Sequence, residues 1–581
     1  MSSRRRLSVP RVLGGSVLLI VVAIGVVFFF QVRSAVGSLN DAGDQAELLK
    51  QQVIDGDVAG AQSTLASLRD ATGDAASTSG GVLWDAAAKV PFVGDDVDTV
   101  RDVSQILDRV TADALPPIVD VADRVNLNAF SPRDGRVDLT AVKEIAPALS
   151  AAKASLTSAR AELDSVGTDG LVGGLGGSVA ALKSGIDSAV TAAEAGDTAA
   201  RLLPSMLGDG GTRRYLLLVQ NNAEVRATGG IPGSFALITA KNGKLTMGAQ
   251  GGIRDLLPFD QDVVPMTKDE KTVFTDQFVR DLRNITQTPD FTRSAEIGRA
   301  MVAKGLGQDV DGVLSVDPVA MSYILGGTGP VTLPLDVQLG QTNAVELLLN
   351  TVYLRLPDED QQDEAFQSAA RAVFDAVSAG AGESRRTIAG LVRAANENRL
   401  MVWSSHDDEQ EVIGTTGIAG TFPADGGASP NVGVYFGDAT GSKLQYYFDF
   451  TPVATASRCL EGGRQEITVR TTLSSSVPDG LPIAVTGYSE PVGVMKLFGW
   501  MYAPFGGRFT DIRLGDEKVP ITTATLDGRA ETSVPITLTP GQTTTLVATM
   551  VTGPGQRGDG VLSTTPGIRT IDNDSVIRSA C

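Results

Sequence analysis

Residues 213–244 constrain the fold of this chain more than any other segment, because they place two apolar runs on either side of a polar junction. Tyr215–Val219 and Phe235–Ala240 are apolar runs of strand length. The dipeptide Asn242-Gly243, which follows the second run, is typical of a tight hairpin turn. The segment therefore predicts two buried strands and a hairpin that leads into a third.

The junction between these two runs is rich in polar side chains and glycines. Its glycines let the backbone come close to a ligand or to another chain. One interpretation is a ligand-binding site at the end of a strand. In the other, the amide side chains cap an irregular turn and Glu224 pairs with Arg226. The candidate binding residues are Asn221, Asn222, Glu224, Arg226, Gly229 and Gly230.

The remaining patterns predict a multidomain α+β protein. Residues 34–203 are rich in alanine and show helical periodicity broken by Gly and Pro, which predicts a helical stalk or bundle. Residues 208–450 alternate between strand and helix patterns, which predicts a mixed α/β domain. Its last expected strands are Val432–Phe436 and Leu444–Phe450. Short alternating runs in residues 455–581 predict a β-sandwich.

The N-terminus predicts a single membrane span. Four arginines in residues 1–11 precede an uncharged apolar stretch at residues 12–30, which is long enough to cross a bilayer. Arg33 interrupts the best cleavage site, which favours an uncleaved signal anchor. Because acidic residues follow the span, we expect residues 1–11 to be a cytoplasmic arm and the bulk of the chain to be extracytoplasmic.

The net charge limits the partners that this chain can bind, and the cysteine content bears on disulfide formation. The net charge of -19 and the pI near 4.6 argue against nucleic acid as a partner. The membrane, a cell-wall glycan or other envelope proteins are the partners that we expect. Cys459 and Cys581 are the only cysteines, and an extracytoplasmic location permits disulfides. We predict that they pair; the alternative is two separate thiols.

The run YLLLVQNNAEVRATGGIPGSFALI resembles the signature of the family called domain of unknown function 4012. Further motifs of the family follow in the same order, and the resemblance covers roughly residues 208–450. They are SAEIGRAMV, DGVLSVDPVAMSYILGGTGPV, RLMVWSSHDDEQ and NVGVYFGDATGSKLQYY. The resemblance implies a bacterial, mainly actinobacterial, envelope protein, but it implies no reaction.

A weaker resemblance concerns the order of strands and arginines. The succession of strand, Arg226, hairpin, strand and then Arg254-Asp255 is similar to that in the LytR-CpsA-Psr phosphotransferases. The resemblance implies that Arg226 and Arg254 hold phosphates of a polyprenyl-pyrophosphate-linked glycan and that Asp255 assists a divalent metal or a proton. Ala227 and Thr228 stand where those enzymes carry an acidic residue, which puts metal-assisted transfer in doubt. In the alternative, both arginines are salt-bridged structural residues.

Several catalytic chemistries are excluded by the residues themselves. His406 is the single histidine and lies in a charged run typical of a solvated surface, which argues against a histidine-based triad and against a multi-histidine metal site. Both cysteines lie far from the polar junction. The stretch GDATGSK at Gly437–Lys443 has the wrong glycine spacing for a phosphate loop, and we interpret it as a hairpin. We expect no cofactor, with a divalent metal only if the chain is a phosphotransferase.

Three functions remain. The first is a non-enzymatic envelope protein that binds a surface glycan or a partner, and we favour it because no catalytic pair is evident. The second is a glycopolymer phosphotransferase. The third is a structural assembly factor that acts through residues 34–203.

Overall fold

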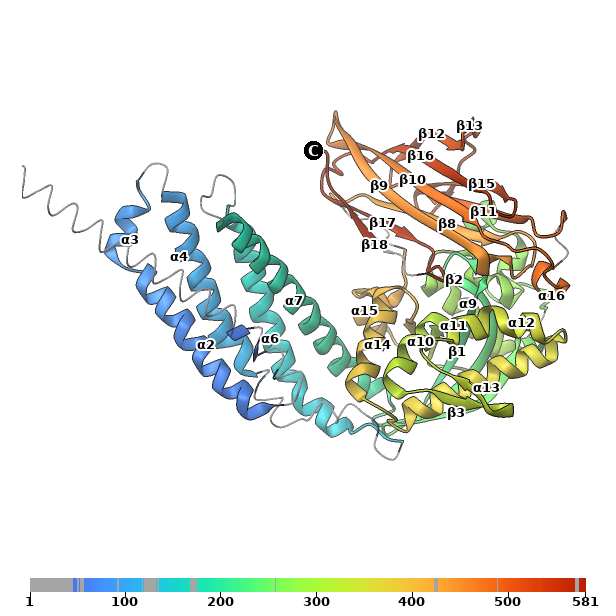
Figure 1. Cartoon of the computed structure of the whole chain (residues 1–581), viewed down its shortest axis with the longest axis horizontal. Helices are drawn as coiled ribbons and strands as arrows, with labels where there is room; N and C mark the ends of the chain where they lie inside the picture. Colours follow the sequence, from blue (N-terminus) through green and yellow to red (C-terminus); the bar gives the residue numbers. More distant parts are fainter. Residues whose placement is uncertain are drawn as a thin grey trace, which may run out of the picture. The chain divides into compact units, whose positions relative to one another are not determined.

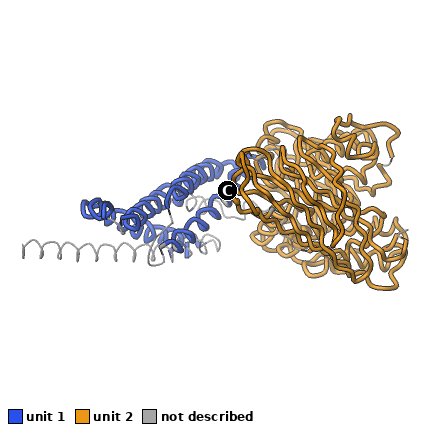
Figure 2. The backbone as a smooth tube through the Cα atoms, turned by 90° about the horizontal axis from the view of Figure 1, so that it is seen from above, with its two compact units in different colours: residues 1–130, 138–204 blue, residues 131–137, 205–581 orange. Residues whose placement is uncertain are grey.

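The computed structural model describes most of residues 57–581 and single positions between 45 and 52; its gaps are residues 91–93, 118, 120–131, 133–134, 168–174, 257, 423–426, 488–489 and 570–573. The predicted arm (1–11) and membrane span (12–30) lie outside the described residues. Within the described part, no helix combines the length and apolarity needed to cross a bilayer. The chain divides into two compact units, residues 1–130 with 138–204 and residues 131–137 with 205–581 (Figure 2).

The first unit is built from helices, as predicted (Figure 1). Its core consists of Val, Ile, Leu and Ala side chains, because the periodicity of each helix places these residues on one face. Many of them are small, so each helix contributes little buried area. The described helices are α2 (Val58–Ser79), α3 (Val82–Ala87), α4 (Gly94–Arg109), the π-helical turn η1 (Val110–Ala114), α6 (Leu139–Ser165) and α7 (Leu175–Met206).

A buried carboxylate ties α6 to α7 within this unit. Asp197 of α7 accepts hydrogen bonds from Ser150 and, at 3.1 Å, from Lys153, both on α6. Burial alone would raise the pKa of Asp197, but these bonds and the charge of Arg201 lower it below its usual value. The charged form therefore holds the two helices together.

The second unit begins with a five-stranded sheet in the order β3-β2-β1-β4-β7. β1 and β4 are parallel, and the other neighbours are antiparallel. The predicted hairpin turn lies between β2 and β3, where Asn242 and Gly243 have positive φ angles of 48° and 81°. The strands are β1 (Arg213–Arg226), β2 (Gly229–Lys241), β3 (Lys244–Gly252), β4 (Gly312–Val316) and β7 (Met401–Ser404).

Helices cover both faces of this sheet, which explains why residues Tyr215–Val219 of β1 are apolar without interruption. Tyr215, Leu217 and Val219 face one cluster, which includes α10, α12 and α13. Leu216 and Leu218 face the other cluster, which includes α9 and the short helix η5. The covering elements are η5 (Leu282–Gln287), α9 (Phe291–Leu306), α10 (Pro318–Thr328), α12 (Val352–Arg355) and α13 (Glu359–Ser378), with α14 (Ser384–Asn396) packed on α10.

The C-terminal part contains the predicted β strands, in a five-stranded sheet β13-β12-β16-β10-β9 and a six-stranded sheet β14-β15-β11-β8-β17-β18 (Figure 1). Their bounds are β8 (Asn431–Asp438), β9 (Phe448–Leu460), β10 (Arg464–Ser475), β11 (Met495–Tyr502), β12 (Arg508–Leu514), β13 (Glu517–Lys518), β14 (Ala524–Leu526), β15 (Arg529–Leu538), β16 (Thr543–Val551), β17 (Gly560–Thr564) and β18 (Asp574–Ile577).

Two strands belong to different sheets than we predicted. We assigned Val432–Phe436 and Leu444–Phe450 to the α/β domain, whereas β8 pairs with β11 and β17, and β9 pairs with β10. Residues 444–447 form a 3-10 turn before β9. Phe436, Phe448 and Phe450 stack together in the core between the two sheets, which accounts for the placement. This core continues without a break into one face of the β1 sheet, so the β-sheet part and the α/β part form a single unit.

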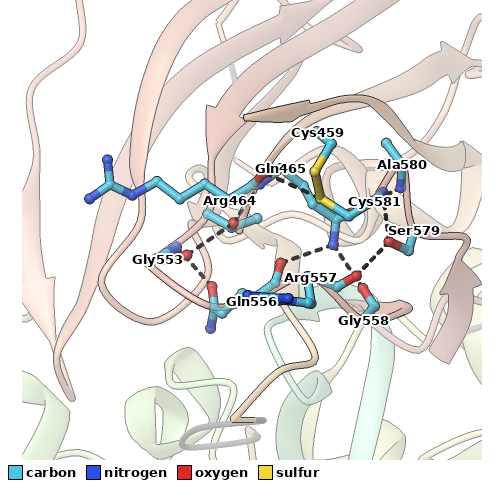
Figure 3. The surroundings of a disulfide bond; sticks show 11 residues. Cys459, Arg464, Gln465, Gly553, Gln556, Arg557, Gly558, Ser579, Ala580 and Cys581 are labelled. Atoms are coloured by element: carbon cyan, nitrogen blue, oxygen red, sulfur yellow. Dashed lines mark hydrogen bonds between the residues drawn. A yellow bond between two sulfur atoms is a disulfide. The ribbon is translucent and has the colours of Figure 1, made fainter. Parts of the chain in front are cut away.

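The two cysteines form a disulfide between β9 and the C-terminus (Figure 3). The buried side chain of Gln465 supports the same end of the chain, since its oxygen accepts a 2.8 Å hydrogen bond from the Ala580 amide. Its nitrogen donates to the carbonyl oxygens of Gln556 and Gly558 at 3.0 and 2.8 Å. The last residues are therefore fixed by both covalent and polar contacts.

A buried carboxyl on β15 makes this part of the protein sensitive to pH. Glu531 lies opposite Tyr502 of β11, is 4% exposed, and its Oε1 accepts no hydrogen bond from any described residue. Burial raises the pKa of Glu531 from 4.5 to about 7. The folded state thus binds a proton that the unfolded state has lost, so stability falls as the pH rises from 4.5 to about 7 and stays reduced above that.

We expect Glu531→Gln to remove this penalty, because the amide resembles the protonated acid. At pH 8 the melting midpoint should rise, because the free energy of unfolding increases by about 3 kcal/mol; at pH 4.5 the midpoint should not change. Differential scanning calorimetry at both pH values measures the effect, with the exposed Glu517→Gln as the control. An equal change at both pH values would contradict the prediction.

Candidate functional site

The polar junction lies inside a bulged strand pair and not in a loop. β1 continues to Arg226 and pairs with β2, but the register shifts between Asn221 and Val225, so residues 222–224 bulge out of the ladder. Gly230 is required here, since a Cβ atom at that position would lie 2.2 Å from the carbonyl oxygen of Asn221. The bulge turns polar side chains out of an otherwise apolar strand at its carboxyl end.

A cleft of about 300 Å³ opens beside the bulge. Of the predicted binding residues, Asn221, Glu224 and Arg254 line it. Asn222, Arg226, Gly229, Gly230 and Asp255 do not line it. The other charged, amide and aromatic lining residues are Gln220, Arg283, Tyr353, Glu359, Gln362, Asp363, Phe366 and Lys443.

Glu224 is an ionised carboxylate at the wall of this cleft. Its Oε2 accepts a 2.5 Å hydrogen bond from Lys443, and its Oε1 lies 3.5 Å from Nη2 of Arg226. Burial alone would raise the pKa of Glu224, but Lys443, Arg226 and then Arg283 lower it below its usual value. The ion pair of Glu224 with Arg226 that we considered thus exists, and Lys443 joins it.

Arg226 has a structural position behind Glu224. Its guanidinium donates to the carbonyl oxygen of Val225 at 3.0 Å and to that of Asp438, at the end of β8, at 3.3 Å. The residue is 7% exposed. It connects the bulge to the β8 sheet, and its placement does not match the phosphate-binding role that the phosphotransferase resemblance implies.

The other predicted binding residues also divide into those that face the cleft and those that support the backbone beside it. Asn221 donates to the Tyr353 hydroxyl and fixes that ring at the cleft. Asn222 points away and donates to Asp317 at 3.0 Å and to the Pro566 carbonyl oxygen at 3.3 Å. Asp255 accepts a 2.8 Å hydrogen bond from the amide of Gly252. These contacts make Asn222 and Asp255 supports of the local backbone.

Arg254 stands at the mouth of the cleft. It lies on η3 (Ile253–Leu256) and forms ion pairs with Glu359, Asp360 and Asp363 in the first turns of α13. Its side chain is 53% exposed, so these ion pairs contribute little to stability. Arg254 is therefore available to a ligand at small cost.

Lys443 reaches the cleft through a loop that we misinterpreted. Gly437–Lys443 is not a hairpin, because it connects strands of two different sheets. The Asp438 carboxylate accepts hydrogen bonds from the Gly441 and Ser442 amides, at 2.5 and 3.2 Å, which folds the loop back toward Glu224. Sequence spacing gave no sign of this, since Lys443 lies 219 residues after Glu224.

A buried arginine holds the segment after β17 against the sheet behind the cleft. Arg399 is 1% exposed and donates to Asp317 Oδ2 at 2.9 Å and to Glu397 Oε2 at 2.7 Å. It also donates to the carbonyl oxygens of Gly567 and Arg569 at 2.6 and 3.3 Å. Asp317 follows β4 directly, next to the polar end of β1, and it also accepts from Asn222.

The residues near Asp255 do not fit a divalent metal. Among the described residues, no group of three or more His, Cys, Asp or Glu side chains is arranged to hold a metal ion. The Asp255 carboxylate is engaged by a backbone amide. No catalytic step through a metal is therefore derived from this site.

Comparison with known proteins identifies a family for part of the second unit. Residues 210–353 match the model of the family described as "Protein of unknown function (DUF4012)", which confirms the family resemblance for β1 through α12. No curated protein and no solved structure matches the chain.

Proposed function

With a domain of unknown function (DUF4012) at residues 210–353, we propose that this chain is a membrane-anchored extracytoplasmic protein whose second unit binds a surface glycan or a partner in cell-envelope assembly. The cleft at the β1 bulge is the observation that supports this function. Its lining combines amides, carboxylates, cations and two aromatic rings. Such groups offer donors, acceptors and ring surface together, which suits a ligand with many hydroxyl groups.

The location is part of the same proposal. The uncharged residues 12–30 would anchor the chain, and the four arginines before them would keep the N-terminus in the cytoplasm. Both units would then lie outside the membrane, where glycans and envelope proteins are found. The disulfide is consistent with an oxidising compartment.

Arg254→Ala tests whether the cleft binds such a ligand. The full chain, purified in mild detergent, is heated with and without a polyprenyl-pyrophosphate-linked disaccharide. A ligand that binds only the folded state raises the melting midpoint. We expect a rise for the wild-type protein that is smaller for Arg254→Ala, because the variant loses a donor at the cleft mouth but little stability.

Arg299→Ala is the matched control for this experiment. Arg299 pairs with Asp309 on the surface and does not line the cleft. The control should therefore show the full ligand-dependent rise. An equal rise in Arg254→Ala and Arg299→Ala, or no rise in the wild-type protein, would contradict binding at this cleft.

A glycopolymer phosphotransferase is the second candidate, because Arg254 and Lys443 line the same cleft. In this reaction an acceptor hydroxyl attacks the glycan-linked phosphorus and the P–O–P bond breaks. Polyprenyl monophosphate leaves, and the hydroxyl proton is released. Ala227 and Thr228 do not supply an acidic residue, and the position of Arg226 behind Glu224 speaks against it. Release of polyprenyl monophosphate together with glycan phosphate bound to the acceptor, by the wild-type chain but not by Arg254→Ala, would establish the transferase.

The assembly-factor alternative needs an apolar stripe on the first unit. The large apolar side chains exposed in the described part of that unit are Leu48, Val82 and Val90, which lie on separate segments. No observation favours this alternative over the cleft.

A further inference from the structure

We propose that Arg283 selects an anionic substituent on the ligand, so that the cleft takes a phosphorylated saccharide in preference to its neutral parent. The inference rests on the proposed function, since it concerns the same cleft. Arg283 lines the cleft from η5, whereas Arg254 lies on η3 and Lys443 on the loop after β8. In the sequence, Arg283 is near Asp281 on a predicted helix face and is a weaker candidate than Arg226 and Arg254.

The guanidinium of Arg283 is held in place by a buried carboxylate. Asp281 is 3% exposed, and its oxygens accept from Nε of Arg283 at 3.0 and 2.9 Å and from Nη2 at 2.5 Å. Asp281 also accepts from the Arg283 backbone amide at 2.9 Å, which fixes the start of η5. A ligand therefore meets an arginine whose orientation is already set, so little side-chain entropy is lost on binding.

This arrangement leaves donors of Arg283 for a ligand. A guanidinium has five N–H groups. Asp281 engages Nε and Nη2, and no described residue accepts a hydrogen bond from Nη1. The side chain is 50% exposed, in contrast to its buried partner Asp281. The free edge of the guanidinium can thus donate to an anion without breaking the ion pair.

The carboxylates that line the cleft already have cationic partners: Lys443 pairs with Glu224, and Arg254 pairs with Glu359 and Asp363. Lys443 and Arg283 both line the cleft, and both lower the pKa of Glu224. Glu224 is already engaged by Lys443 and Arg226 and does not need Arg283. A phosphate monoester brings nearly two negative charges and three terminal oxygens, which is more than a single carboxylate offers to several donors.

Titration calorimetry on the full chain in detergent tests the proposal with glucose 1-phosphate, inorganic phosphate and glucose as probes. We expect glucose 1-phosphate to bind at least about tenfold more tightly than glucose. Arg283→Gln should weaken glucose 1-phosphate binding by about tenfold or more and leave glucose binding unchanged. Inorganic phosphate should compete with glucose 1-phosphate, which separates recognition of the phosphate from recognition of the sugar.

Arg280→Gln is the matched control. Arg280 lies three positions before Arg283 but pairs with Asp262 and Asp276 and does not line the cleft. Its phosphate binding should equal that of the wild type. If Arg283→Gln does not fold, Arg283→Lys keeps the charge and should still bind phosphate more weakly than the wild type.

Two results would overturn the inference: equal affinity for glucose 1-phosphate and glucose, or unchanged phosphate binding by Arg283→Gln. If the polyprenyl-linked disaccharide still raises the melting midpoint of the wild type more than that of Arg254→Ala, the proposed function stands and only the role of Arg283 is refuted. If that disaccharide does not bind either, the proposed function fails as well.

Discussion

Arg399→Met should destabilise the second unit by about 3–5 kcal/mol, the largest effect that we expect from a single substitution. Arg399 is fully buried and neutralises Asp317 and Glu397. Methionine has a similar length but cannot donate a hydrogen bond. Asp317, which is 3% exposed, would keep only the Asn222 amide and the Ala320 backbone amide as donors.

The loss should extend beyond the ion pair. The carbonyl oxygens of Gly567 and Arg569 would lose their donor, which would loosen the segment after β17 from the sheet. Urea denaturation followed by circular dichroism measures the change in midpoint. Arg299→Met, on an exposed ion pair with Asp309, should cost less than about 1 kcal/mol. If both variants lost a similar amount of free energy of unfolding, the buried contacts of Arg399 would contribute no more to stability than an exposed ion pair.

Removing the disulfide should have an effect of similar size. Cys459 and Cys581 close a loop with a sequence separation of 122 residues. In the chain-entropy model, a cross-link over a loop of this length stabilises the folded state by up to about 5 kcal/mol, because it restricts the unfolded chain. We expect the double variant Cys459→Ser, Cys581→Ser to unfold at a clearly lower urea concentration.

Part of the loss should be offset by local contacts. Gln465 still holds the Ala580 amide after the cross-link is gone, so the C-terminus does not detach at once. Unfolding of the wild type with a reducing agent should match that of the double variant, and the double variant should not respond to the reducing agent. An unchanged urea midpoint of the reduced wild type would refute the prediction.

Local sequence patterns were enough to predict most individual elements. The apolar run Tyr215–Val219 lies in β1, and the turn at Asn242-Gly243 has the expected positive φ angles. The second apolar run, Phe235–Ala240, lies in β2. These predictions succeed because strand alternation, helical periodicity and turn residues act over a few neighbouring positions.

Sheet membership could not be predicted in the same way. β8 and β9 have ordinary strand patterns, and such patterns do not reveal the partner strand. The packing of Phe436 against Phe448 and Phe450 decides the partner, and the sequence pattern of each strand is equally compatible with either sheet. For the same reason, we interpreted Gly437–Lys443 as a hairpin when it links two sheets.

The sequence by itself determined that a polar junction lies at the end of β1, and three of its candidate residues, Asn221, Glu224 and Arg254, line the cleft. Only the tertiary structure decided that Arg226 turns behind Glu224 and that Arg283 and Lys443 reach the cleft. The physical reason is range: strand and turn preferences are local, whereas a cleft is formed by side chains that packing brings together from distant segments.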